Sequence, residues 1–278
     1  MSSILTNNSA MNALSTLRSV NNNLNETQNR ISTGQKVNSA KDNASYFSIA
    51  TTMKTESGMN KAVNEGLTLT KNSVSTARLG AETVVGLAQQ FVDRLAFAQT
   101  EGVDQADVQK ELTSLAAQMK TAIAQSSFNG ENLISAAGAG TKTVVSGISR
   151  DATGLSTTEI AFTSTDIEAV QGTFAAIAIT NASTPADLKT ALTNAEGYLA
   201  SVTDAATDLG IAEKQIETQQ TFLNQLGDRL DAGVGSMVDA DMEKEAARLQ
   251  SLQVQQQLST QSLSIANQAP QNILSLFR

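Results

Sequence analysis

Between residues 67 and 98, ten side chains follow one another at alternating spacings of three and four, and only one of the ten is polar. Because an α-helix turns once in 3.6 residues, this spacing gathers the ten side chains into one stripe. A stripe of this length is buried only when a second helix packs lengthwise against it. The sequence therefore predicts a long helix from about residue 45 to residue 100, within a helical bundle. The stripe consists of Leu67, Thr70, Val74, Ala77, Ala81, Val84, Ala88, Phe91, Leu95 and Ala98.

Other stripes of the same spacing predict the partner helices of this bundle. Asp104 is a candidate N-cap of a third helix, since its carboxylate can accept a hydrogen bond from a free backbone N–H of the first turn. Thr184, followed by Pro185 and Asp187, predicts a further helix start, after which the pattern stays helical nearly to the end of the chain. The predicted bundle core consists of Val74, Ala81, Val84, Phe91, Leu95, Leu112, Leu115, Met119, Ile216, Leu223, Leu226 and Leu230.

The two ends of the chain carry stripes that are half polar and nearly free of charge. Residues 1–29 contain only Arg18 and Glu26 as charged side chains, and residues 249–278 contain only Arg278. A solvated helix normally has a charged outer face, so these helices are expected to have neighbours on several sides, which many copies of the chain can supply. Alone they bury too little apolar surface, so we predict disorder in the monomer and helix in an assembly. The candidate packing residues are Leu14, Leu17, Asn21, Leu24, Gln28, Ile31, Leu249, Leu252, Gln256, Leu263, Ile273, Leu274 and Leu276.

Between the helical regions the composition changes to Gly, Ala, Ser and Thr with short β-branched runs, which predicts one or two hairpins. Gly34 is expected just after the first helix, and Asn129-Gly130 is a strong turn dipeptide. The predicted fold class is mostly α: a long antiparallel bundle or coiled coil of the N- and C-terminal regions, with a small central segment containing a β-hairpin. The expected domains are terminal helices (1–44 and 240–278), an outer-core bundle (45–134 and 186–239) and a short exposed segment (135–185).

The composition argues against catalysis and cofactors. The chain has no histidine and no cysteine, and its formal net charge of −8 disfavours nucleic acid as a partner. The glycines of AGAG (137–140) follow no strand, and VDADMEKE (238–245) lacks the spacing of a calcium loop, so Asp239 or Asp241 is interpreted as the N-cap of the last helix. The N-terminus lacks the pattern of a cleaved secretory signal, and no apolar run approaches the roughly 20 residues that cross a bilayer. The chain is therefore predicted to be soluble, without a membrane partner.

Two sequence blocks, one toward each end of the chain, contain specific motifs. The first runs from about residue 4 to residue 134 and includes ISTGQKVNSAKDNAS and SSFNGENLI. The second runs from about residue 188 to residue 278 and includes VDADMEKEA and ANQAPQNILSLF. Together they cover about four fifths of the chain, and they resemble bacterial flagellins, especially those of alphaproteobacteria. The resemblance implies a short-form flagellin that polymerises into the extracellular flagellar filament used for motility.

The resemblance also implies partners and a route of export. Flagellins leave the cell without a cleaved signal, through the type III export apparatus, as largely unfolded chains. The implied partners are copies of the chain itself, other flagellins, the export apparatus and its chaperone, and the hook-associated and cap proteins. The alternative reading is a hook–filament junction protein, which shares the terminal helices but usually has a different C-terminal ending. An enzyme inserted in the central segment and a membrane-folding translocator are weaker alternatives, since neither a catalytic motif nor an apolar hairpin is present.

One segment departs from the family pattern. Many flagellins are sensed by an innate immune receptor through a segment that matches residues 90–97 here. Phe91 stands where those flagellins have a receptor-contacting arginine, and Arg94 stands where they have a glutamate. The resemblance therefore implies weak or absent activation of that receptor. The altered segment comprises Gln90, Phe91, Asp93, Arg94 and Leu95, with Glu111 as a retained glutamate.

Overall fold

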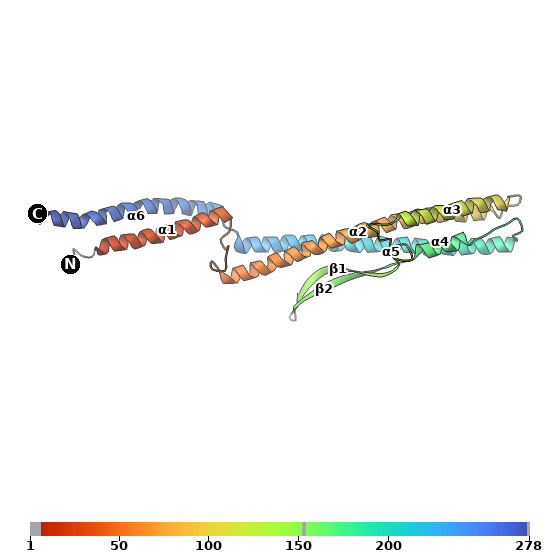
Figure 1. Ribbon diagram of the computed structural model, residues 1–278, viewed down its shortest axis with the longest axis horizontal. Helices are drawn as coiled ribbons and strands as arrows, with labels where there is room; N and C mark the ends of the chain where they lie inside the picture. Colours follow the sequence, from red (N-terminus) through yellow and green to blue (C-terminus); the bar gives the residue numbers. More distant parts are fainter. Residues whose placement is uncertain (1–6, 152–153, 277–278) are drawn as a thin grey trace. The chain divides into compact units, whose positions relative to one another are not determined.

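The computed structural model describes the backbone of residues 7–151 and 154–276, and the side chains of residues 7–150 and 154–268. In this part of the chain there are six helices and one two-stranded antiparallel sheet, which confirms the predicted fold class (Figure 1). None of the described helices is long and apolar enough to cross a membrane. The elements are α1 (Asn8–Thr33), α2 (Ala44–Phe97), α3 (Gln105–Gln125), β1 (Gly140–Asp151), β2 (Gly154–Ser164), α4 (Ile167–Ala175), α5 (Pro185–Val238) and α6 (Met242–Leu276).

The chain divides into two compact units, which are described separately. Unit 1 comprises Met1–Thr55 with Arg229–Arg278, and unit 2 comprises Glu56–Asp228. Both divisions fall inside the long helices α2 and α5. The sequence-based division at residues 44 and 240 instead followed helix ends, where composition and turn residues change.

The helix ends form as their capping residues predict. Gly34 adopts the left-handed conformation (φ 71°), and its N–H donates to the Arg30 carbonyl. Asp104 accepts a hydrogen bond from the Ala106 N–H at the start of α3. At the start of α5, Thr184 and Asp187 form reciprocal bonds: the Thr184 N–H donates to the Asp187 carboxylate (2.9 Å), and the Asp187 N–H donates to the Thr184 hydroxyl (3.2 Å).

The C-terminal helical region is broken just before α6, where the sequence indicated an N-cap at Asp239 or Asp241. Helix α5 ends at Val238 and α6 begins at Met242. The Lys36 N–H donates to the Val238 carbonyl (2.7 Å), and the Ala240 N–H donates to the Gly34 carbonyl (2.8 Å). These bonds to the segment after α1 replace helical bonds at the break. Asp241, rather than Asp239, then caps α6 by accepting a bond from the Lys244 N–H (3.1 Å).

The central segment contains one hairpin and one helix that was not predicted. Strands β1 and β2 pair antiparallel, with a bulge between Val145 and Gly147. The carbonyl of the bulged Ser146 accepts a bond from Gln219 Nε2 of α5 (2.7 Å), which ties the hairpin to the bundle. After β2, Asp166 caps the nine-residue helix α4. The composition of this stretch predicted only an irregular segment.

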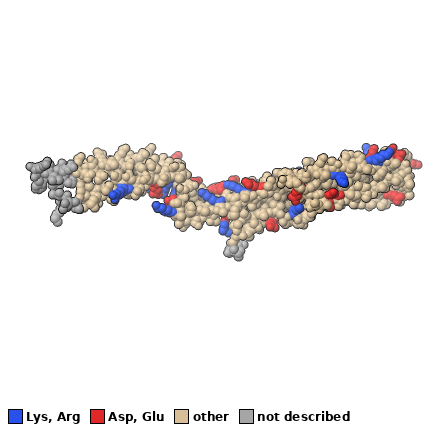
Figure 2. Space-filling model, viewed as in Figure 1, with Lys and Arg blue, Asp and Glu red and all other residues tan. Residues whose placement is uncertain are grey.

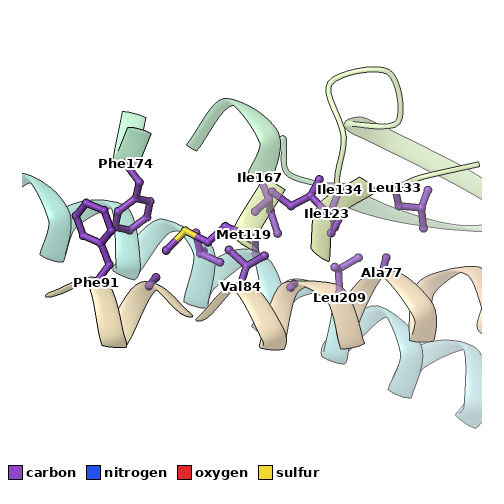
Figure 3. Close-up of a cluster of buried hydrophobic side chains, with 14 of the residues drawn as sticks. Ala77, Val84, Phe91, Met119, Ile123, Leu133, Ile134, Ile167, Phe174 and Leu209 are labelled. Atoms are coloured by element: carbon purple, nitrogen blue, oxygen red, sulfur yellow. The ribbon is translucent and has the colours of Figure 1, made fainter. Parts of the chain in front are cut away.

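The core of unit 2 follows the predicted stripe of α2. Apolar side chains from α2, α3, α4 and α5 meet there, as the labelled residues in Figure 3 show. Phe91 of α2 and Phe174 of α4 lie edge to face, with ring centroids 5.1 Å apart. The segment 133–134 closes the core beside the hairpin, where the Ser164 hydroxyl bonds the Leu133 carbonyl. Helix α4 therefore covers a core that the sequence assigned to the long helices alone.

A single glycine allows α2 to approach the end of α3. A Cβ atom added at Gly80 would lie 1.9 Å from Ser126 Oγ and 2.5 Å from Ser126 Cβ. We expect Gly80→Ala to destabilise unit 2 by about 1–3 kcal/mol, because the two helices must separate. Gly86→Ala is the matched control: nothing lies within 4 Å of its added Cβ, so it should stabilise the helix by up to about 1 kcal/mol. Denaturant unfolding of both variants checks this, and equal effects would contradict it.

Candidate assembly surface

The terminal helices α1 and α6 pair with each other in unit 1. Three polar contacts run along the pair: Asn7 Nδ2 donates to the Ala266 carbonyl (2.8 Å), Gln256 Nε2 to Asn21 Oδ1 (2.7 Å), and Arg30 Nη1 to Glu245 Oε1 (3.3 Å). Along these three contacts the residue number rises in α1 and falls in α6, so the two helices are antiparallel. These contacts give the pair a defined register that its small apolar side chains could not specify alone.

On α1 the face toward α6 is displaced from the predicted stripe. Val20 and Thr27 are buried, whereas Leu14 is 37% exposed and Gln28 is also exposed. Leu17, Leu24, Ile31 and Asn21 are half-buried. Leu17, Leu24 and Ile31 fit two possible stripes. The predicted stripe continues through Asn21 and Gln28, and the other continues through Val20 and Thr27. The missed signal was the order Leu17, Val20, Leu24, Thr27, Ile31, which places β-branched side chains in the contact.

Helix α6 has apolar side chains on two opposite faces. Leu252 is buried, and Leu249, Gln256 and Leu263 are half-buried on the face toward α1. The remaining predicted packing residues, Ile273, Leu274 and Leu276, lie outside the described side chains. About half a turn away lies a second stripe of the same heptad spacing, whose large members are exposed: Val254, Leu258 and Ile265. No charged residue occurs between Leu249 and Phe277, and Figure 2 shows a nearly uncharged surface over α1 and α6 on the face that it draws.

One largely buried charge lies at the inner end of this pair. The Glu245 side chain is 9% exposed and pairs with Arg30, which also binds Glu26 of its own helix (2.5 Å). The second carboxylate oxygen of Glu245 is buried without a hydrogen-bond partner among the described residues. A half-satisfied buried pair contributes little net stability, so its stronger effect is to disfavour other registers of α1 on α6.

Among the twelve predicted bundle-core residues, burial is complete in the centre and partial at the edges. Leu115, Leu226 and Leu230 are half-buried, and Leu230 belongs to unit 1. The other nine are buried: Val74, Ala81, Val84, Phe91, Leu95, Leu112, Met119, Ile216 and Leu223.

Charged side chains tie α2 to α5 across the surface of unit 2. Arg78 Nε lies 2.7 Å from Glu213 of α5, and Arg78 Nη1 lies 2.5 Å from Glu82 of its own helix. The hydrogen bonds from these two carboxylates, Glu213 first, raise the pKa of Arg78 above its ordinary value. Hydrogen bonding and charge attraction from Lys214 lower the pKa of Glu217. In the described residues no cluster of acidic side chains could hold a metal ion. The ion pairs of Arg78 thus connect α2 to α5.

The altered receptor segment divides between core and surface. Phe91 and Leu95 are buried, whereas Gln90, Asp93 and Arg94 are exposed. Arg94 Nε lies 3.2 Å from Glu111 Oε2 of α3. The exposed residues and Glu111 line an open groove of about 460 Å³ between α2 and α3. The side chain at the family's arginine position therefore points into the bundle.

Comparison with known proteins connects both ends of the chain to one family. A family model described as the bacterial flagellin N-terminal helical region matches residues 4–139, and one for the C-terminal helical region matches residues 192–277. A flagellin of Brucella melitensis biotype 1 is 42% identical over 285 residues, covering all of both chains. Flagellin C of Rhizobium meliloti (strain 1021) is 37% identical over 320 residues, also covering both chains completely. Flagellin FljM of Caulobacter vibrioides is 34% identical over 281 residues, covering all of this chain and 99% of the relative.

Proposed function

Because the chain belongs to the bacterial flagellin family, and is a structural subunit of the extracellular flagellar filament, we propose how its two ends carry out assembly. One face of α6 contacts α1 of the same chain. The opposite face, with Val254, Leu258 and Ile265, contacts terminal helices of other copies. The observation that carries this proposal is the second apolar face of α6, in a stretch that carries no charge from Leu249 to Phe277. Burial of this face upon polymerisation would remove the exposed apolar surface from water.

The state of the chain before assembly belongs to the same proposal. We infer that the terminal helices order only when copies surround them, which would let the chain pass through the export apparatus unfolded and without a cleaved signal. Chaperone, cap and hook-associated proteins are the partners that this route requires. The chain would have no enzymatic role. No feature of the described residues favours the hook–filament junction reading.

Removal of residues 249–278 tests the role of the terminal helices. We expect the truncated chain to fail to polymerise on filament seeds, because α1 loses its partner and the second apolar face is gone. Residues 56–228 should remain folded, as judged by circular dichroism and limited proteolysis. Full-length chain should elongate the same seeds into long filaments. Elongation by the truncated chain at the full-length rate would contradict the proposal.

Recognition by the innate immune receptor provides a separate prediction. We expect this flagellin to activate the receptor weakly or not at all in reporter cells, compared with an enterobacterial flagellin at equal concentration. The physical reason is that Phe91 is 1% exposed and offers no cationic group at the surface. Activation at the enterobacterial potency would contradict this prediction.

A further inference from the structure

The start of α2 presents a cluster of large apolar side chains to solvent. Tyr46, Phe47 and Ile49 are 45%, 37% and 49% exposed, and we call them the aromatic knob. Every residue from 38 to 49 is exposed. No other window of four described residues contains three exposed large apolar side chains. In a chain with 2 tyrosines and 8 phenylalanines, such a concentration at the surface calls for a contact that covers it.

Local hydrogen bonds hold this knob in place. Asn43 accepts a bond from the Tyr46 N–H (3.1 Å) and thereby caps α2. Just before it, the Asp42 carboxylate accepts bonds from the Asn38 N–H (3.1 Å) and the Ser39 N–H (3.0 Å). These bonds lower the pKa of Asp42 below its ordinary value. The knob is therefore presented by a capped helix after a bonded turn, which reduces the entropy lost on binding.

Unit 2 contains a cavity of matching character beside the hairpin. It has a volume of about 300 Å³ and we call it the hairpin pocket. The hydroxyl of Ser73 in its lining is buried and has no hydrogen-bond partner among the described residues. On the polar side, Lys142 and Glu131 pair at 3.0 Å and leave no net charge. Its apolar lining consists of Leu69, Phe128, Leu133, Val144 and Phe162.

We propose that the aromatic knob of one copy fills the hairpin pocket of a second copy, with the Tyr46 hydroxyl bonding the Ser73 hydroxyl. A tyrosine combines an apolar ring with a polar tip, which fits an apolar pocket that contains one unpartnered hydroxyl. The other tyrosine, Tyr198, is already packed against Phe174, with ring centroids 5.6 Å apart. The knob carries no charge, and the two charges of the pocket pair with each other. The proposed contact therefore buries no unpaired charge. This inference rests on the proposed function, since it concerns copies within a filament.

The knob and the pocket lie at different positions along the sequence of α2. Tyr46 and Leu69 lie on the same helix, 23 residues apart, which corresponds to about 34 Å at 1.5 Å per residue. We therefore assign the knob and the pocket to different copies. Because knob and pocket are different surfaces, each copy can give one and receive one. Such a heterologous contact does not have to close and can continue through a filament.

The absence of native cysteine allows a direct test of this contact. The variant with both Tyr46→Cys and Leu69→Cys is polymerised and treated with a short-spacer bis-maleimide. We expect a ladder of covalent dimers, trimers and longer chains, because each copy carries both halves of the contact. Each single variant should give no ladder, and unpolymerised protein should remain monomeric. A decoy pair combines Tyr46→Cys with Leu79→Cys, since Leu79 is as exposed as Leu69 (64% and 63%) but does not line the pocket.

A second measurement remains informative if the cysteines disturb assembly. We expect Tyr46→Ala to raise the monomer concentration needed for elongation by about tenfold or more, as for truncation of a buried interface aromatic. Tyr46→Phe and Ser73→Ala should each have a smaller effect, and the double variant should be no worse than Tyr46→Phe alone. Normal filaments with an equal ladder from the decoy pair, or an unchanged elongation threshold for Tyr46→Ala, would overturn this inference and leave the filament function intact. Failure of the unaltered chain to polymerise would instead overturn the proposed function.

Discussion

Replacing Leu263 with Glu should abolish filament growth while residues 56–228 stay folded. Leu263 is half-buried on the face of α6 toward α1, in a stretch where no charged residue occurs from Leu249 to Phe277. A carboxylate there would lose water on assembly without gaining a cationic partner, which costs far more than one apolar contact contributes. Every copy in a filament would carry this cost, so the effect should be close to complete. Leu274→Glu is expected to act likewise, although its side chain lies outside the described residues.

The matched control is Ser262→Glu, which adds the same charge at the neighbouring exposed position. It should retain measurable elongation on seeds, because its carboxylate can stay nearer to water at the edge of the α1–α6 contact. Seeded elongation followed by light scattering separates the two variants, and circular dichroism of the monomers shows whether the bundle is intact. Normal filaments from Leu263→Glu would show that the α1–α6 contact is not required in the polymer.

The long bundle could be predicted because its signal is repeated many times. Leu67 through Ala98 supply ten positions on one face, and a change in the order of spacing would bring polar residues into the core. The predicted caps at Asp104 and Thr184 formed for a similar reason, since capping depends only on the neighbouring backbone N–H groups.

The terminal pair gave a less definite pattern. In α1 two stripes are possible, one with Leu14 and Gln28 and the other with Val20 and Thr27. Both contain the same three apolar residues, and neither stripe is strongly apolar. The choice depends on the fit against α6 and on polar bonds such as Asn21 with Gln256, which periodicity cannot reveal. Contacts with other copies add a further influence that a single chain does not contain.

Helix α4 and the hairpin pocket depend on contacts between distant parts of the sequence. Ile167–Ala175 is too short to be stable alone, and its neighbours are rich in β-branched residues. The cap at Asp166 was the available local signal, but the decisive contact is between Phe174 and Phe91, 83 residues earlier in the chain. The pocket likewise combines α2, the turn near Asn129 and both strands. No local pattern encodes such a combination.

Replacing Phe174 with Ala should lower the unfolding free energy of unit 2 more than the Gly80 substitution does. The side chain is fully buried and packs edge to face against both Phe91 (5.1 Å) and Tyr198 (5.6 Å). Removal of a buried phenylalanine ring typically costs about 3–5 kcal/mol, because the cavity left behind collapses only in part. That is a large share of the roughly 5–15 kcal/mol that stabilises an ordinary domain.

The loss should appear first in α4, because a nine-residue helix depends on its contacts with the rest of unit 2. The remaining contacts are the buried Ile167 side chain, the bonds from the Ile167 and Glu168 N–H groups to the Ile134 carbonyl (3.1 and 3.3 Å), and the bond from Gln171 Nε2 to the Ala116 carbonyl (3.0 Å). Without the Phe174 ring, these contacts offset less of the entropy of ordering nine residues. Hydrogen exchange of residues 167–175 should therefore accelerate in Phe174→Ala even where α2 and α5 remain protected. The control is Phe222→Ala, which removes the same ring from an exposed site and should change the unfolding free energy by about 0.5 kcal/mol or less. If denaturant unfolding gave equal losses for the two variants, the edge-to-face aromatic cluster would not be what fastens α4 to the bundle.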